Sequence, residues 1–91
     1  MRFKITDHSG YSVPDDALDR LWTQLGPRQE DVSFAKVGSE IKATVGDEAP
    51  VSMTHDERVD ISRRAVLAVV TDVCERVSGL NPDWFAVSFE G

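Results

Sequence analysis

The stretch THDERVDISRRAVLAVVTDVCERV, residues 54–77, decides the fold, because its middle is compatible with two secondary structures. The run AVLAVVTDV at 65–73 is rich in β-branched residues and could form a strand on local propensity alone. The valines of the segment, however, recur at the spacing of one helix face. They are Val59, Val66, Val70, Val73 and Val77. A strand at 65–73 in place of this helix would change the whole arrangement predicted below.

Both ends of the segment also favour a helix from residue 55 to about residue 77. Thr54 and Glu57 have the spacing of a capping box, in which each side chain bonds the backbone N–H of the other residue. Gly79 follows the last apolar residue and is typical of a helix end. We therefore predict a helix.

Two stretches earlier in the chain have the alternation of half-buried strands. MRFKIT at 1–6 alternates apolar and polar residues, and VSFAKVGSEIKATV at 32–45 predicts a hairpin. With a two-residue loop at 38–39, Val37 faces Glu40 and pairing continues outward. The apolar side chains of both hairpin strands then share a face, which favours this register over a slip of one residue.

The stretch SVPDDALDRLWTQLGP at 12–27 predicts the other helix. Ser12 and Asp15 have capping-box spacing, and Gly26 with the following proline ends the apolar periodicity. The expected helix therefore begins close to Ser12.

The last stretch, NPDWFAVSFEG at 81–91, alternates again and predicts a final strand. Phe85, Val87 and Phe89 point one way, and we assign Phe85 and Phe89 to the core. Trp84 points the other way if the alternation extends through it.

The resulting order, β-α-β-β-α-β, predicts an α+β fold. The expected architecture is a ferredoxin-like, split β-α-β two-layer sandwich, in which two helices lie on one face of a four-stranded antiparallel sheet. With 91 residues, the chain is expected to form one domain, 1–91.

Composition excludes several classes of function. The single cysteine, Cys74, allows no intrachain disulfide, and no Cys/His spacing suggests a metal or a cofactor. A net charge of −6 opposes binding to nucleic acid or anionic lipid. The longest apolar run, residues 65–70, is too short to cross a bilayer. We expect a soluble, cytoplasmic protein.

The open face of the sheet, which no helix covers in this fold, is the candidate interaction face. The candidate contacts on it are its three cations and two of its apolar side chains, which are Arg2, Lys4, Lys42, Val37 and Trp84. Tryptophan in a small apolar patch is a frequent anchor of protein interfaces, so a protein partner or a homodimer is expected here. The alternative is a solvated sheet face with one half-covered tryptophan.

The loop at 7–13 is the candidate ligand site, because His8 and Tyr11 lie close together there. They could serve a small ligand or acid–base chemistry, although a loop histidine is commonly an ordinary surface residue. Catalytic motifs are otherwise missing from the sequence. The leading hypothesis is therefore a non-catalytic protein-interaction or accessory module, and the alternative is a small-ligand-binding protein or minor enzyme that uses this loop.

Overall fold

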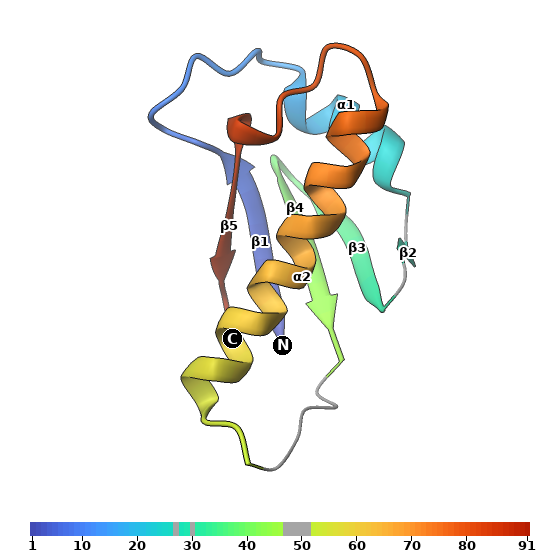
Figure 1. Cartoon of the computed structure of the whole chain (residues 1–91). Helices are drawn as coiled ribbons and strands as arrows, with labels where there is room; N and C mark the ends of the chain where they lie inside the picture. The colour runs from blue at the N-terminus through green and yellow to red at the C-terminus, as the bar shows by residue number, and fades with distance from the viewer. Residues whose placement is uncertain (27, 30, 47–51) are drawn as a thin grey trace.

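The computed structural model describes residues 1–26, 28–29, 31–46 and 52–91 (Figure 1). In chain order the elements are β1 (Arg2–Asp7), α1 (Ala17–Leu25), β2 (Arg28–Gln29), β3 (Val32–Val37), β4 (Glu40–Val45), α2 (His55–Arg76), the 3₁₀ helix η1 (Pro82–Trp84) and β5 (Phe85–Phe89). The segment at 65–73 is therefore helical, as its periodicity predicts.

The strands form one sheet in the order β2-β3-β4-β1-β5, and all neighbouring pairs are antiparallel. β1, β3 and β4 have six residues each and β5 has five, whereas β2 has only two. The predicted α+β class, with an open antiparallel sheet and two helices among the described residues, is confirmed. The short β2 was not predicted, since two polar residues show no alternation.

The hairpin of β3 and β4 has the predicted register. Val37 pairs with Glu40, and Phe34 pairs with Ala43. The loop between them needs a left-handed backbone, and Gly38 supplies it at a φ of 60°. Gly38 thus allows the two-residue loop, and this loop sets the register that places the apolar side chains of both strands on one face.

The capping box of α2 is present as predicted. The Glu57 N–H donates to Thr54 Oγ1 at 3.2 Å, and the Thr54 N–H donates to Glu57 Oε1 at 3.4 Å. Beyond this cap, Val66, Val70 and Val73 are buried. Capping and apolar periodicity therefore agree, which explains why helix formation overrides the β propensity of the segment.

Both helices pack on the same face of the sheet, and α1 also contacts α2 (Figure 1). A single apolar cluster fills the space between the layers. Its buried members are Phe3, Ile5, Ala17, Leu21, Leu25, Val32, Phe34, Ile41, Ala43, Val66, Val70, Val73, Cys74, Leu80 and Phe85. The strand residues among them alternate with exposed or half-buried ones, so the other face of the sheet is open to solvent.

The first helix begins at Ala17, later than the predicted start near Ser12. A helix capped by Ser12 would need helical geometry at Val13, and a residue that precedes a proline is disfavoured there. Pro14 therefore delays the helix, and the predicted capping box of Ser12 and Asp15 is wrong.

Trp84 does not belong to the final strand. The Asp83 N–H donates to Asn81 Oδ1 at 2.9 Å, and Pro82 occupies the first turn of η1. This cap starts a 3₁₀ turn that includes Trp84, so the strand begins at Phe85. The predicted alternation through Trp84 is wrong, and its side chain is half-buried against the core.

Phe89 was predicted to be a core residue, but it is 41% exposed, whereas Phe85 is 5% exposed. The Phe89 ring meets the Phe3 ring edge-on, with centroids 5.6 Å apart, and the His55 ring at 5.8 Å. Phe89 ends an outer strand, and the helix above it is only beginning there. The helix therefore covers the Phe89 side chain only in part.

Candidate functional site

Three cations of the predicted interaction face do lie together. Lys4 of β1 pairs directly with Lys42 of β4, and Arg2 follows on the same face of β1. Val37 is 55% exposed but sits at the hairpin end of β3. Trp84 lies outside the sheet ladder, in η1. The five predicted residues therefore form a cation cluster and two separate positions.

Two carboxylates neutralise the centre of that cluster. Lys42 Nζ donates to Glu40 Oε2 at 3.0 Å and also pairs with Glu90. These hydrogen bonds, first the one to Glu90 and then the one to Glu40, raise the pKa of Lys42. The hydrogen bond from Lys42 also lowers the pKa of Glu40. The open face is thus a set of satisfied ion pairs around Lys4 and Arg2.

The loop at 7–13 holds its aromatic pair together. The rings of His8 and Tyr11 meet edge-on, with centroids 4.9 Å apart and an interplanar angle of 81°. The Gly10 N–H donates to His8 Nδ1 at 3.2 Å, and the Tyr11 N–H donates to the His8 carbonyl at 3.1 Å. His8 Nδ1 is therefore used as an acceptor inside the loop, which leaves Nε2 and the exposed Tyr11 hydroxyl for any ligand.

The candidate ligand loop and Trp84, one member of the predicted interaction face, are neighbours in space. The His8 N–H donates to the Trp84 carbonyl at 2.8 Å, which extends the β1–β5 ladder beyond the last strand residue. The candidate loop and the displaced tryptophan therefore lie at the same end of the sheet.

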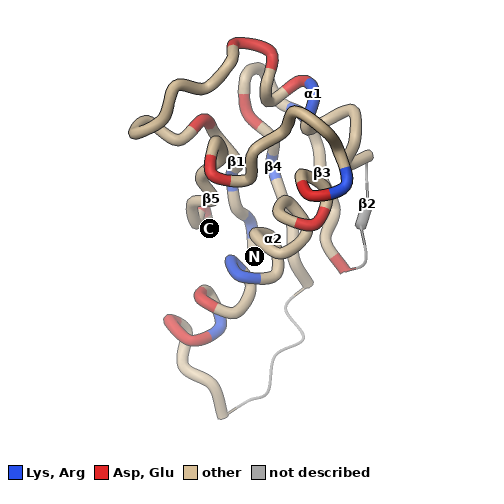
Figure 2. Tube along the Cα trace, turned by 45° about the horizontal axis from the view of Figure 1, so that its top comes forward, with Lys and Arg blue, Asp and Glu red and all other residues tan. Residues whose placement is uncertain are grey.

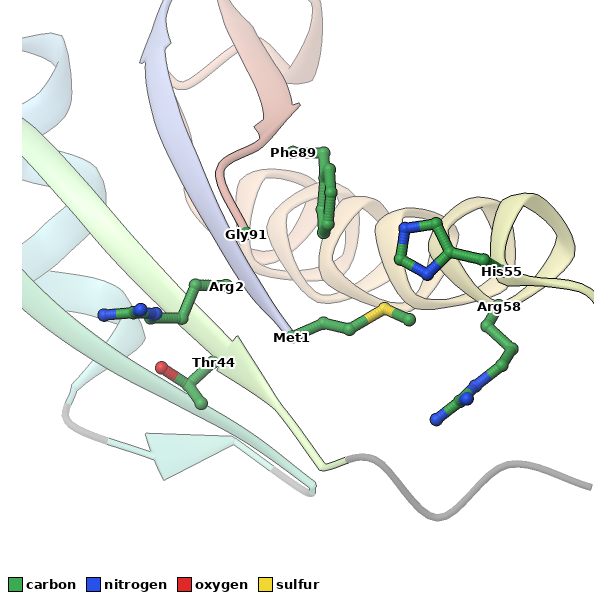
Figure 3. A pocket seen from close by; sticks show the side chains of 7 residues that line it. All are labelled: Met1, Arg2, Thr44, His55, Arg58, Phe89 and Gly91. Carbon is green, nitrogen blue, oxygen red and sulfur yellow. The ribbon is translucent and has the colours of Figure 1, made fainter.

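An open depression of about 520 Å³ lies at the opposite end of β1 (Figure 3). Its lining residues are Met1, Arg2, Thr44, His55, Arg58, Phe89 and Gly91. Cationic and aromatic side chains meet there. The adjacent end of α2 already holds Asp56 and Glu57 in its first turn and a complete capping box, in which the Glu57 N–H has an acceptor within the chain.

This depression was not predicted from the sequence, because its residues are far apart in the chain. Phe89 was assigned to the core, and residue 55 was considered only as the start of the predicted helix. Topology could have found it. In this antiparallel arrangement the start of β1, the ends of β4 and β5, and the start of α2 must meet at one sheet end.

The outer edge of β5 is a further candidate surface. β5 is the last strand in the sheet order, with a neighbour on one side only among the described strands. The bonds from His8 N–H to the Trp84 carbonyl and from Glu90 N–H to the Arg2 carbonyl, both 2.8 Å, fix the alternation. The backbone N–H and C=O groups of even-numbered residues in this strand therefore point toward β1, and those of odd-numbered residues point outward.

The outward backbone groups belong to Phe85, Val87 and Phe89. The Phe85 N–H is used within the chain, since it donates to the Pro82 carbonyl. The N–H groups of Val87 and Phe89 point away from β1 and have no partner within the part of the chain that the structure describes. A partner strand would find two donors and three acceptors there.

The side chains of β5 do not protect this edge. No charged residue occurs between Asp83 and Glu90 (Figure 2), and no proline or lysine interrupts the sequence FAVSF at 85–89. Edge strands usually carry such residues to prevent pairing with another chain. Glu90, which follows the strand, pairs with Lys42 and is thereby held on the open face. β5 is thus an open pairing edge.

The chain matches no protein-family model, no curated protein and no solved structure with which we compared it. None of its described helices has the length and apolarity needed to cross a membrane. Within the same described ranges, no group of three or more His, Cys, Asp or Glu side chains could hold a metal ion.

Proposed function

We propose that this chain is a non-catalytic protein-interaction module, built on a ferredoxin-like split β-α-β sandwich, and that the outer edge of β5 receives an extended segment of its partner. The order of the four longer strands, β3-β4-β1-β5, supports the ferredoxin-like assignment, because β1 and β4 are the inner pair and each connects to an outer strand.

One observation carries the functional proposal: β5 is an uncharged edge strand with outward N–H groups at Val87 and Phe89. Addition of a strand to such an edge gives affinity through backbone hydrogen bonds and specificity through alternate side chains. The half-exposed ring of Phe89 offers an apolar contact beside those bonds. The open-face residues Arg2 and Lys4, on the neighbouring strand β1, are the proposed flanking contacts.

Affinity capture from the native cells tests this function when two variants are compared with the unmodified protein. Val87→Pro removes an outward N–H and leaves the bonds to β1 in place, so it abolishes capture of the partner. Val87→Thr keeps both the N–H and the branched shape, and it retains capture. A partner that binds both variants equally contradicts a role for the β5 edge.

A small-ligand site at the 7–13 loop is the second candidate, and the exposed edge-on pair of His8 and Tyr11 favours it. If it is correct, His8→Ala abolishes ligand binding and leaves the fold unchanged by circular dichroism. Ligand binding that is indifferent to His8→Ala contradicts this candidate.

A further inference from the structure

Building on the proposed function of the β5 edge, we infer that its occupant is the β5 edge of a second copy of this chain. The two strands pair antiparallel about a two-fold axis at Val87, so that the two sheets continue as one. The support comes from the sequence of β5, from its outward backbone groups and from the charges at its ends.

The strand is self-complementary along its length. FAVSF at 85–89 has phenylalanine at both ends and valine at the centre, so its apolar face has the same pattern in either direction. An isologous dimer requires this property, because every contact occurs twice. With the axis at Val87, Phe85 faces Phe89 of the second copy and the two valines face each other. Aromatic and β-branched cross-strand pairs are among the favourable ones.

The hydrogen-bonding groups match the same register. The Val87 N–H meets the Val87 carbonyl of the second copy, and the Phe89 N–H meets the Phe85 carbonyl of the second copy. In this register the Phe85 N–H is opposite the Phe89 carbonyl of the second copy, but it is already donated to the Pro82 carbonyl and needs no partner from that copy. Every donor on this edge is thus satisfied in the dimer.

The side chains around the axis permit close approach. Ala86 and Ser88, on the open face, are small, and the strand itself carries no charge. In this register Glu90 lies opposite Trp84 of the second copy, and Asp83 lies opposite Gly91, so no two like charges are directly paired. Phe89, 41% exposed in one copy, gains a neighbouring phenylalanine.

Net charge sets the direction of the salt dependence. Each copy carries −6, so two copies repel each other at long range. Added salt screens that repulsion and leaves the backbone and apolar contacts in place. Dimerisation therefore becomes tighter as the salt concentration rises, which is opposite to the behaviour of an association held by ion pairs.

Sedimentation velocity of the purified chain, from about 1 μM to about 1 mM, tests the inference. The mass is expected to rise from 10.1 kDa toward twice that value, and to do so at lower protein concentration in about 0.5 M salt. Val87→Pro is expected to weaken association at least about tenfold, and Val87→Thr to retain it. A mass of 10.1 kDa throughout contradicts the homodimer. The proposed function then still stands if Val87→Pro abolishes capture of a different protein.

Disulfide trapping tests the register independently of the proline variant. In a Cys74→Ala background, Val87→Cys is expected to cross-link to itself under mild oxidation, because Cα atoms in a directly opposed pair lie about 5.5 Å apart. Ser88→Cys is the matched control, since its copies are offset along the two strands. Cross-linking of Ser88→Cys in preference to Val87→Cys contradicts the axis at Val87. A salt-dependent dimer that forms equally well with Val87→Pro, and cross-links through neither position, contradicts the inference. The proposed function is contradicted as well only if capture of a different protein is also unaffected by Val87→Pro.

Discussion

The backbone N–H of His8 bonds the carbonyl of Trp84 at 2.8 Å, although neither residue belongs to a strand. This contact extends the β1–β5 ladder by one pair and determines its alternation. Because the backbone carbonyl of Trp84 points toward β1, the backbone N–H and C=O groups of Ala86 and Ser88 also point toward β1. Those of Val87 point away. A backbone contact outside the sheet thus determines which amides of β5 are available to another chain.

Proline substitutions at adjacent positions test this alternation in the monomer. Ser88→Pro removes a bond to the Lys4 carbonyl, whereas Val87→Pro removes only an outward N–H. Ser88→Pro is expected to lower the free energy of unfolding by about 2 kcal/mol more than Val87→Pro. Urea denaturation at a protein concentration below that of association measures the difference. Equal losses, or a larger loss for Val87→Pro, would show that the assigned alternation is reversed.

The core makes a second prediction. Leu21 of α1 is fully buried between the helices and the sheet, so Leu21→Ala leaves a cavity and is expected to lower the free energy of unfolding by about 2–5 kcal/mol. Ile61→Ala is the control, because Ile61 is 53% exposed on α2, and it is expected to change stability by less than about 0.5 kcal/mol. Urea denaturation compares both. A loss for Ile61→Ala as large as that for Leu21→Ala contradicts the assigned face of α2.

The ion pairs of Lys42 predict a pH dependence with a definite sign. The hydrogen bond from Lys42 lowers the pKa of Glu40, so this contribution to stability is complete above about pH 4.5 and is lost as the pH falls through the Glu40 pKa of the folded state. Lys42→Met is expected to return the Glu40 pKa toward its ordinary value and to remove that part of the acid sensitivity. Carboxyl carbon NMR measures the titration. A Glu40 pKa that is unchanged by Lys42→Met refutes the assigned cause.

Cys74 is buried, and burial raises the pKa of its thiol. Because the thiolate is the reactive form, a disulfide reagent at mildly alkaline pH is expected to modify Cys74 far more slowly in the folded protein than in denaturant. The matched control is Ser78→Cys in a Cys74→Ala background, since position 78 is exposed and just beyond α2. Equal reaction rates for the two folded proteins would contradict the packing of Cys74.

The helix at 55–77 and the β3–β4 hairpin could be predicted because their signals are local and agree with each other. The valine spacing and the Thr54 cap indicate the same helix. Gly38 has the backbone freedom that a tight hairpin loop needs, and that loop sets the strand register. Where one local signal competes with another, the prediction failed. Pro14 suits a first helical turn but also restricts Val13, and the second effect determines where α1 begins.

The candidate surfaces were harder to predict, because they depend on long-range pairing. Alternation alone placed Trp84 on the open face. The competing signal, the Asn81 cap that starts η1, affects only the three residues of that short helix. The exposure of Phe89 follows from the position of β5 at the edge of the sheet, which the residues of the strand do not encode by themselves. Which amides face outward likewise requires the ladder to be known.

Amide hydrogen exchange of β5, followed by NMR at increasing protein concentration, shows whether the outer edge of this strand is the surface through which two copies pair. The amides of Ala86 and Ser88 are expected to be protected at every concentration, because they bond β1. The amides of Val87 and Phe89 are expected to exchange freely in dilute protein and to become protected as the copies pair. If Val87 and Phe89 stay unprotected while the protein associates, or if they are already protected in dilute protein, the outer edge of β5 is not the pairing surface.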